Sequence, residues 1–316
     1  MSILAIGTVA FDSIETPTGS ADRVLGGSAT YITLAARFFC EPVRLVGVVG
    51  ADFPAPYIES LRRCGIDLDG LEVDPDGATF AWAGRYHADM NGRDTLATHL
   101  NVLQTFSPIL PARFRDSRIV CLGNLDPSIQ MQVLDQMDAP ELVICDTMNF
   151  WIDHTPEALE ALLGRIDCLM INDEEARQLA GESNLMLAAR AIMAKGPRIL
   201  VIKKGEHGAI VLDETSVFAF PAFPLEHIQD PTGAGDTFMG GFAGYLTRHT
   251  TFTSDSIRRA IMYGSALASF TVERFGPERL LHLRPEEINE RMAAYRRITH
   301  LPDVQPLTWT NGSYHG

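Results

Sequence analysis

Short apolar runs alternate with segments of helical period along almost the whole chain, and no other feature constrains the fold as much. The runs have the length and composition of buried strands and lie at 3–6, 43–49, 119–122, 142–145, 168–171 and 199–202. Helical patterns separate them, at 27–39, 54–63, 127–137, 173–179, 185–194, 234–246 and 254–273. This order predicts an α/β fold, a doubly wound, mainly parallel sheet with helices on both faces. Its sites should lie beyond the carboxyl ends of the strands.

One region departs from the pattern. Between 77 and 107 apolar and polar residues alternate around Asn91-Gly92, which is typical of a β-hairpin. Together with the segment 12–27 this hairpin predicts a small second sheet that stands off the main body as a lid, and an ordinary edge hairpin is the alternative. We expect one main domain over 1–300 and a loosely packed or disordered tail at 301–316.

Charge limits the possible partners. The chain has 26 basic and 40 acidic residues, a net charge of -14, which repels nucleic acid and anionic membranes at long range. We therefore expect neither as a partner. A phosphate-bearing ligand would be held by local backbone amides, a metal ion or a few basic side chains. The start MSILAIG has no leader pattern, no apolar run could span a bilayer, and the five cysteines form no paired motif, so we predict a cytoplasmic protein.

The run DPTGAGDTF at 230–238 carries the strongest chemical signal. Gly233 and Gly235 allow a tight turn whose amides, with that of Ala234 and the following helix N-terminus, can bind an anion. Asp236 then lies in the first helical turn, where a carboxylate can deprotonate a hydroxyl during phosphoryl transfer. The alternative is an ordinary Gly-rich helix start with a favourably placed Asp. The sequence contains neither a Walker A loop nor a dinucleotide fingerprint.

This run and the double glycine Gly26-Gly27, which opens an alanine-rich helix, resemble the PfkB, or ribokinase-like, family of carbohydrate and nucleoside kinases. The resemblance extends from about residue 4 to residue 296. It implies a kinase that moves the terminal phosphoryl group of ATP onto a hydroxyl, with Mg²⁺ and a β-sheet lid.

The resemblance also implies roles for single residues. Asp236 would be the general base, and the anion hole would consist of Gly233, Ala234 and Gly235. Substrate hydroxyls would bind Asp12 and the backbone of Gly26 and Gly27. On residue type alone, Asp12 is equally well a polar loop residue and the two glycines a tight turn.

The nucleotide side matches the family in three places. Asn172 and Glu175 match its N-x-x-E motif, which organises Mg²⁺, although an Asn N-cap with an acidic first turn is the commoner situation. After a buried strand, the nucleotide-binding turn would use Lys203, Gly205 and Gly208. Asp230 and Thr232 match family positions that would hold a monovalent cation such as K⁺, and Thr232 would also contact the nucleotide. Gly264 would lie on the nucleotide side too, where it replaces a residue that often borders the base.

Three positions depart from the sugar-specific members. Tyr31 and Ala10 stand where those members carry Asn, which argues against ribose itself. We expect Tyr31 to lie at the substrate pocket, where its ring would stack on a base or another flat group if the substrate carries one. Asp126 could add a substrate contact, and a helix N-cap is its alternative role.

We weigh three functions on this basis. The first is an ATP-dependent kinase of a sugar or sugar derivative. The second is a nucleoside kinase, with Tyr31 or a lid aromatic against the base. The third is a non-catalytic ligand-binding protein, which the retention of Asp236 and the anion-hole glycines disfavours. A homodimer formed through the lid is a further possibility.

Overall fold

The computed structural model describes residues 2–300, so Met1 and the predicted tail at 301–316 lie outside the described residues. The strands of the main sheet are β1 (Ile3–Ile6), β4 (Val43–Gly50), β5 (Ile66–Asp74), β8 (Ile119–Leu122), β9 (Leu142–Asp146), β10 (Cys168–Asn172), β11 (Ile199–Lys203), β12 (Ala209–Leu212) and β13 (Val217–Phe220). Within 2–300 their order is β13-β12-β11-β10-β9-β8-β1-β4-β5. Neighbours are parallel from β11 to β5, and β12 and β13 add an antiparallel edge. The predicted mainly parallel sheet is confirmed.

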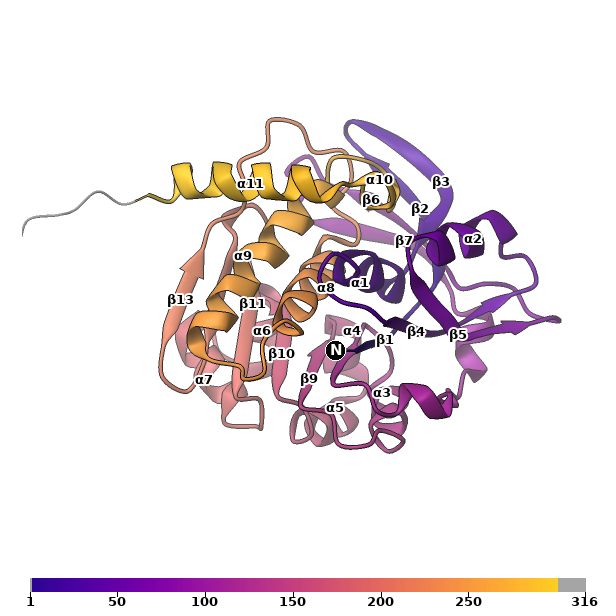
Figure 1. The fold of residues 1–316 in the computed structure, drawn as a ribbon, viewed down its shortest axis with the longest axis horizontal. Coiled ribbons are helices and arrows are strands. Elements are labelled where there is room, and N and C mark those ends of the chain that lie inside the picture. Colours follow the sequence, from indigo (N-terminus) through magenta and orange to yellow (C-terminus); the bar gives the residue numbers. More distant parts are fainter. Residues whose placement is uncertain (1, 301–316) are drawn as a thin grey trace, which may run out of the picture.

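Helices cover both faces of this sheet (Figure 1). On one face lie α1 (Ser28–Ala36), α2 (Ala55–Arg63), α8 (Ala234–Leu246), α9 (Ser254–Thr271), α10 (Glu278–His282) and α11 (Pro285–Ile298). On the other lie α3 (Pro127–Leu134), α4 (Asn149–His154), α5 (Pro156–Leu163), α6 (Asp173–Ala180) and α7 (Leu185–Met193). Ile3 and Ala5 of β1 pack into one core cluster, whereas Leu4 and Ile6 pack into the other. Successive side chains of a strand point to opposite faces, and both faces are covered, so the central strands are apolar along most of their length.

The second sheet consists of β2 (Ala10–Thr16), β3 (Gly19–Gly26), β6 (Ala81–Tyr86) and β7 (Arg93–His99), in the order β3-β2-β6-β7. The pairs β2–β3 and β6–β7 are antiparallel, and β2 and β6 are parallel. The predicted hairpin is confirmed, since the amide of His87 bonds the carbonyl of Gly92 at 2.8 Å across the turn. The segment after Asp12 joins the same sheet, as expected.

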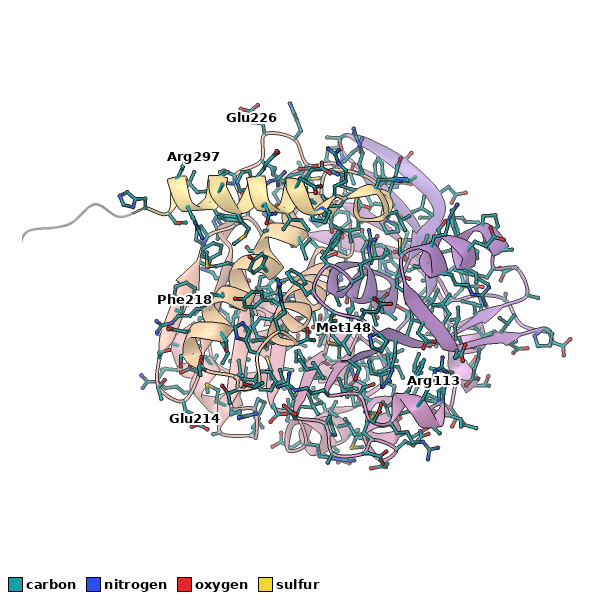
Figure 2. The ribbon with its side chains drawn as sticks, viewed as in Figure 1. Arg113, Met148, Glu214, Phe218, Glu226 and Arg297 are labelled. Carbon is teal, nitrogen blue, oxygen red and sulfur yellow. The ribbon has the colours of Figure 1, made fainter. Side chains whose placement is uncertain are left out.

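Side chains fill the space between the layers (Figure 2). Met148, labelled near the centre of that view, follows β9, and Nδ2 of Asn124 lies 3.0 Å from its sulfur. Both residues follow the carboxyl ends of neighbouring strands, and the predicted site lies at this edge. None of the helices within 2–300 is long and apolar enough to cross a membrane.

Candidate active site

The turn before α8 has the shape expected of an anion-binding site. Gly233 is the N-cap of α8 with φ 76°, in the left-handed region where a side chain is strained. A β-carbon there would also overlap the ring of Tyr31. The amide of Thr237 bonds the carbonyl of Gly233 at 2.8 Å, so the helix begins directly after the turn. The first amides of a helix lack intrahelical partners and point at a ligand placed beyond its end.

Asp236 lies in the first turn of α8 and is half-buried. Desolvation and the charge of Asp146 raise its pKa to about 7, against the opposing effect of Lys203 and Arg93. A carboxyl group with such a pKa accepts a proton far more readily than an exposed one.

Lys203 ends β11 and reaches over the same turn. Its Nζ lies 2.9 Å from Oδ2 of Asp146, and only 3.0 Å from where a β-carbon of Gly235 would stand. Burial alone would lower the pKa of Lys203, but the carboxylates of Asp146, Glu175 and Asp236 raise it above its ordinary value. The lysine is therefore a charged amine shared by three acidic groups beside the anion-binding turn.

Asn172 and Glu175 start α6 at the end of β10. Oδ1 of Asn172 accepts from the amide of Glu175 at 2.8 Å, and Oε2 of Glu175 accepts from the amide of Asn172 at 2.9 Å. The alternative role, a helix cap, is thus realised. Glu175 also belongs to the site, because burial and the charge of Asp146 raise its pKa to about 7 while Lys203 lowers it.

Asp12 enters the site from β2 and is 5% exposed. Its carboxylate occupies the space that a side chain at Gly26 would need, and the backbone of Gly27 donates a hydrogen bond to it. Desolvation and the charge of Asp230 raise its pKa to about 7, with a smaller contribution from Asp236. The charge of Asp236 at the start of α8 therefore reaches the carboxyl group of Asp12 on β2, and their roles as base and hydroxyl-binding acid stay predictions.

Tyr31 corrects one prediction. Its ring is 1% exposed and fills the space over Gly233, so no face is free for stacking on a substrate. The physical reason is the missing side chain of Gly233, which lets the ring become part of the core. The Tyr31 hydroxyl has no hydrogen-bond partner among the described residues.

Asp126 caps α3, since its Oδ1 accepts from the amide of Ser128 at 2.8 Å. The alternative role is the one observed. Its neighbour Asn124 is tied instead to α4, because Oδ1 accepts from Nε1 of Trp151 at 2.9 Å.

Asp230 is fully buried and joins two loops. Its Oδ1 accepts from the amide of Thr232 at 2.8 Å and its Oδ2 from the amide of Gly276 at 3.0 Å. This arrangement fixes the turn before α8 to the loop after α9, and a monovalent cation stays a prediction. Thr232 faces the second sheet, where its Oγ1 lies 3.1 Å from the hydroxyl of Tyr86.

The remaining glycines serve backbone geometry. Gly205 and Gly208 have φ 51° and 89°, and a side chain on Gly208 would overlap the carbonyl of Phe220. Gly264 is buried, and a β-carbon there would come within 2.7 Å of the Phe238 carbonyl. Gly264 lies in the contact between α8 and α9, and a place on the nucleotide side stays a prediction.

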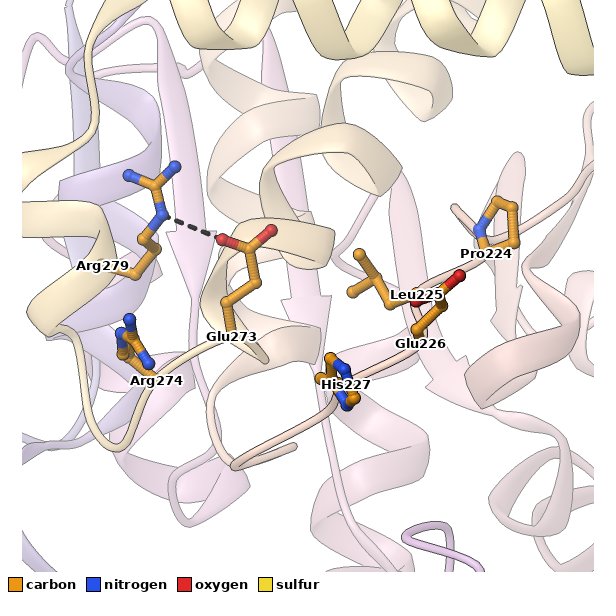
Figure 3. Close-up of a pocket in the computed structure, with 7 residues that line it drawn as sticks. All are labelled: Pro224, Leu225, Glu226, His227, Glu273, Arg274 and Arg279. Carbon is orange, nitrogen blue, oxygen red and sulfur yellow. Dashed lines mark hydrogen bonds and ion pairs between the residues drawn. The ribbon is translucent and has the colours of Figure 1, made fainter. Parts of the chain in front are cut away.

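A cavity of about 720 Å³ opens beside this site (Figure 3). It lies between the loop 224–227 and the residues Glu273, Arg274 and Arg279, where Nε of Arg279 bonds Oε2 of Glu273 at 2.9 Å. Neither Asp12 nor Asp236 lines it. We place the proposed chemistry at the carboxylates, since the turn at 233–235 does not line this cavity either.

Sequence reasoning missed Asp146 and Arg93. Asp146 is the last residue of β9 and lies beside Met170 of β10. Its position at the carboxyl end of a buried strand was a usable signal. Arg93 had no signal, because only the fold of the second sheet brings it near Asp236 and Glu175.

Comparison with known proteins identifies the family. Residues 3–282 match the pfkB family carbohydrate kinases. Cytidine kinase from Thermococcus kodakarensis is 29% identical over 251 residues, covering 78% of this chain and 88% of that protein.

Two solved structures share the fold. Nucleoside kinase from Burkholderia thailandensis, in complex with ADP-inosine, has a TM-score of 0.77 at 21% identity and covers 96% of this chain and 98% of its own. A putative ribokinase II from E. coli, in complex with ATP and Mg²⁺, has a TM-score of 0.75 at 21% identity, with coverages of 93% and 99%. The two structures show the fold, and the family match over nearly the whole chain establishes that the chain belongs to the PfkB family of carbohydrate kinases.

Proposed function

We propose that this ATP-using kinase phosphorylates a hydroxyl of a sugar ring that Asp12 binds, and that Asp236 is the general base. One observation carries the proposal: Asp12 on β2 of the second sheet and Asp236 at the start of α8 come from separate elements, yet desolvation raises the pKa of both carboxyl groups, and the charge of Asp236 helps to raise the pKa of Asp12. The turn with Gly233 and Gly235 lies directly beside Asp236, where charge on the transferring group must be stabilised.

The residues of this chain would divide the work as follows. Asp12 accepts hydrogen bonds from substrate hydroxyls and orients the ring. Asp236 takes the proton of the attacking hydroxyl. The amides at the start of α8 bind the oxygens of the transferring phosphoryl group, and Lys203 supplies positive charge at the same place.

A divalent cation fits the acidic side of the site. Asp146, Glu175 and Asp236 all act on the single amine of Lys203, so the cluster has more negative than positive charge. Mg²⁺ is commonly bound by one or two carboxylates together with substrate phosphates, and this group of carboxylates can supply that number. Glu175 and Asp146 would hold it, and the bound ion would neutralise phosphate charge. Activity should disappear in EDTA and return with added Mg²⁺, and full activity in EDTA would contradict the assignment.

A nucleoside is the second candidate substrate, favoured by Trp82. In the β2–β6 ladder Trp82 lies directly beside Asp12, and paired residues of neighbouring strands project to the same face. The ring is only partly buried and covers Gly84. A ribose hydroxyl on Asp12 would thus place the attached base near an aromatic face. The cytidine and nucleoside kinases among the similar proteins support the same substrate class.

The second sheet would act as a lid. It contacts the nucleotide side at separate points, through Tyr86 to Thr232, through Asn91 to Glu206 at 3.4 Å, and through Thr18 to the carbonyl of Ile228 at 3.4 Å. We extend the proposal to a homodimer through this lid, because Leu96 on its edge strand β7 is 47% exposed. Light scattering of the wild type and of Leu96→Lys would test it, and a monomeric wild type would contradict it.

The function is tested by an ADP-release screen with ATP, Mg²⁺ and a panel of nucleosides, sugars and sugar phosphates. We expect turnover with at least one acceptor, and failure with the whole panel would overturn the proposal.

On the best nucleoside, Trp82→Ala should weaken binding by about 1–3 kcal/mol, as loss of base–aromatic stacking does. The control is Tyr31→Phe, which leaves the lid unchanged. An equal effect of Trp82→Ala on a compact sugar would argue against stacking.

A further inference from the structure

Arg93 is the first residue of β7 and lies on the face of the second sheet that covers the active site. In the antiparallel β6–β7 ladder it is directly opposite Tyr86. Directly opposed residues of such a pair project to the same face. Tyr86 is 6% exposed, and its hydroxyl lies 3.1 Å from Oγ1 of Thr232 in the turn before α8. The side chain of Arg93 therefore projects toward the same turn.

Two other basic residues of this hairpin, Arg85 and His87, have acidic partners, whereas Arg93 has an aromatic one. Nε of Arg85 lies 2.7 Å from Glu15, and Nε2 of His87 lies 3.2 Å from Asp94. In the part of the chain that the structure describes, Arg93 forms no ion pair, and its guanidinium lies 5.8 Å from the ring centre of Trp82. An aromatic face positions a guanidinium without using its hydrogen-bond donors on a carboxylate.

The charge of Arg93 reaches the catalytic carboxylates. Desolvation raises the pKa of Asp236 and the pKa of Glu175, and the positive charge of Arg93 lowers both pKa values. Lys203, the other cation at this place, is already bound to Asp146 at 2.9 Å. The guanidinium of Arg93 thus retains free donors beside the anion-binding turn.

We propose that Arg93 is a catalytic residue that binds the transferring phosphoryl group from the second sheet. This inference rests on the proposed kinase function. The bond between the γ-phosphorus and the β,γ-bridging oxygen breaks, and its electron pair leaves with ADP. The substrate hydroxyl oxygen bonds to phosphorus, and its proton goes to Asp236. Arg93 exchanges neither protons nor electrons, and its planar donors bind two oxygens of the phosphoryl group as charge shifts during transfer.

The test compares Arg93→Ala, Arg93→Lys and the control Arg85→Ala, which alters the outer face of the same hairpin. With ATP, Mg²⁺ and the best acceptor from the screen, Arg93→Ala should lower kcat by about 10²–10³, as removal of a transition-state donor does. Arg93→Lys should lose less, Arg85→Ala should stay within about threefold, and millimolar ethylguanidinium should restore part of the activity of Arg93→Ala. Affinity for ADP, measured by calorimetry, should be unchanged.

Several outcomes would overturn the assignment. They are a kcat of Arg93→Ala within about threefold of wild type, an equal loss in Arg85→Ala, or a raised KM for the acceptor at unchanged kcat. A wild type without any kinase activity would instead refute the underlying function, so the two failures are distinguishable. Thermal unfolding of each variant establishes that the hairpin is intact.

Discussion

The carboxyl edge of the main sheet and the second sheet meet at one site, but they are built differently. β1, β4, β8 and β9 are buried along their whole length, whereas six of the seven residues of β7 are exposed. The proposed acid–base and phosphate-binding groups of the main-sheet side lie at strand ends and helix starts that the core fixes. The second sheet reaches the same site through a few polar contacts.

This difference separates two tasks. Groups that must be positioned closely for proton transfer belong to the element with the deepest packing. Groups that must let substrate in and then cover it belong to an element whose contacts are few enough to break. Substitutions on the main-sheet side should therefore lower kcat, and substitutions on the second sheet, apart from Arg93, should act mainly on KM.

The largest expected effect is that of Asp236→Asn. The change keeps the shape and removes the proton acceptor, so kcat should fall by about 10²–10⁴ with little change in ADP affinity. The measurement is steady-state turnover on the best acceptor. Asp255→Asn is the control, because Asp255 is also an acidic residue in a first helical turn, that of α9. Wild-type turnover of Asp236→Asn, or an equal loss of kcat in the control, would contradict the assignment of Asp236 as the general base.

Gly233→Ala should come next. The backbone at φ 76° costs about 1–2 kcal/mol for a residue with a β-carbon, and the overlap with the Tyr31 ring adds to it. We expect lower kcat together with a loss of about 1–3 kcal/mol in unfolding free energy, measured by denaturant titration. The control is Gly181→Ala, which has φ 64° and open space around the β-carbon. A loss no greater than in the control would show that the Tyr31 contact is not tight.

The pH dependence of stability tests both sides together. The pKa values of Asp12 and Asp236 rise to about 7 in the ligand-free fold, so between about pH 4 and 7 the folded state binds more protons than the unfolded state. Their contribution to stability is complete below this window and is lost as the pH rises through it. The melting temperature should thus fall from pH 5 to pH 8, and Asp12→Asn or Asp236→Asn should reduce the fall.

The control is Glu214→Gln, because Glu214 is exposed in the segment between β12 and β13 (Figure 2). This variant should keep the wild-type fall of the melting temperature between pH 5 and pH 8. If Asp12→Asn also keeps the wild-type fall of the melting temperature, the carboxyl group of Asp12 is better solvated than its burial indicates.

The smallest effect is expected for Tyr86→Phe. It removes one hydroxyl contact between the second sheet and Thr232, worth about 0.5–1.5 kcal/mol. KM for the acceptor should rise by up to about tenfold while kcat changes little. A selective fall in kcat would mean that this contact belongs to the catalytic side, and the division between the two sheets would need revision.

The sequence by itself determined the elements that depend on local pattern. Its apolar runs and helical periods specify the parallel sheet, and Asn91-Gly92 specifies the hairpin, because turn and strand preferences act between near neighbours. The DPTGAGDTF run likewise marked Asp236 and the anion-binding turn, since two glycines before a helix dictate their own local geometry. The edge strands β5, β12 and β13 lacked a comparable signal in the pattern we used.

Only the tertiary structure decided which groups meet. Nothing near Asp146 or Arg93 in the chain indicates that both act on Asp236, since their charges converge through strand register and the placement of the second sheet. Tyr31 could not be assigned from its spacing either, because its burial depends on the absent side chain of Gly233, 202 positions later in the chain. Local pattern fixes the elements, whereas the distances between charges from separate elements exist only once those elements are packed.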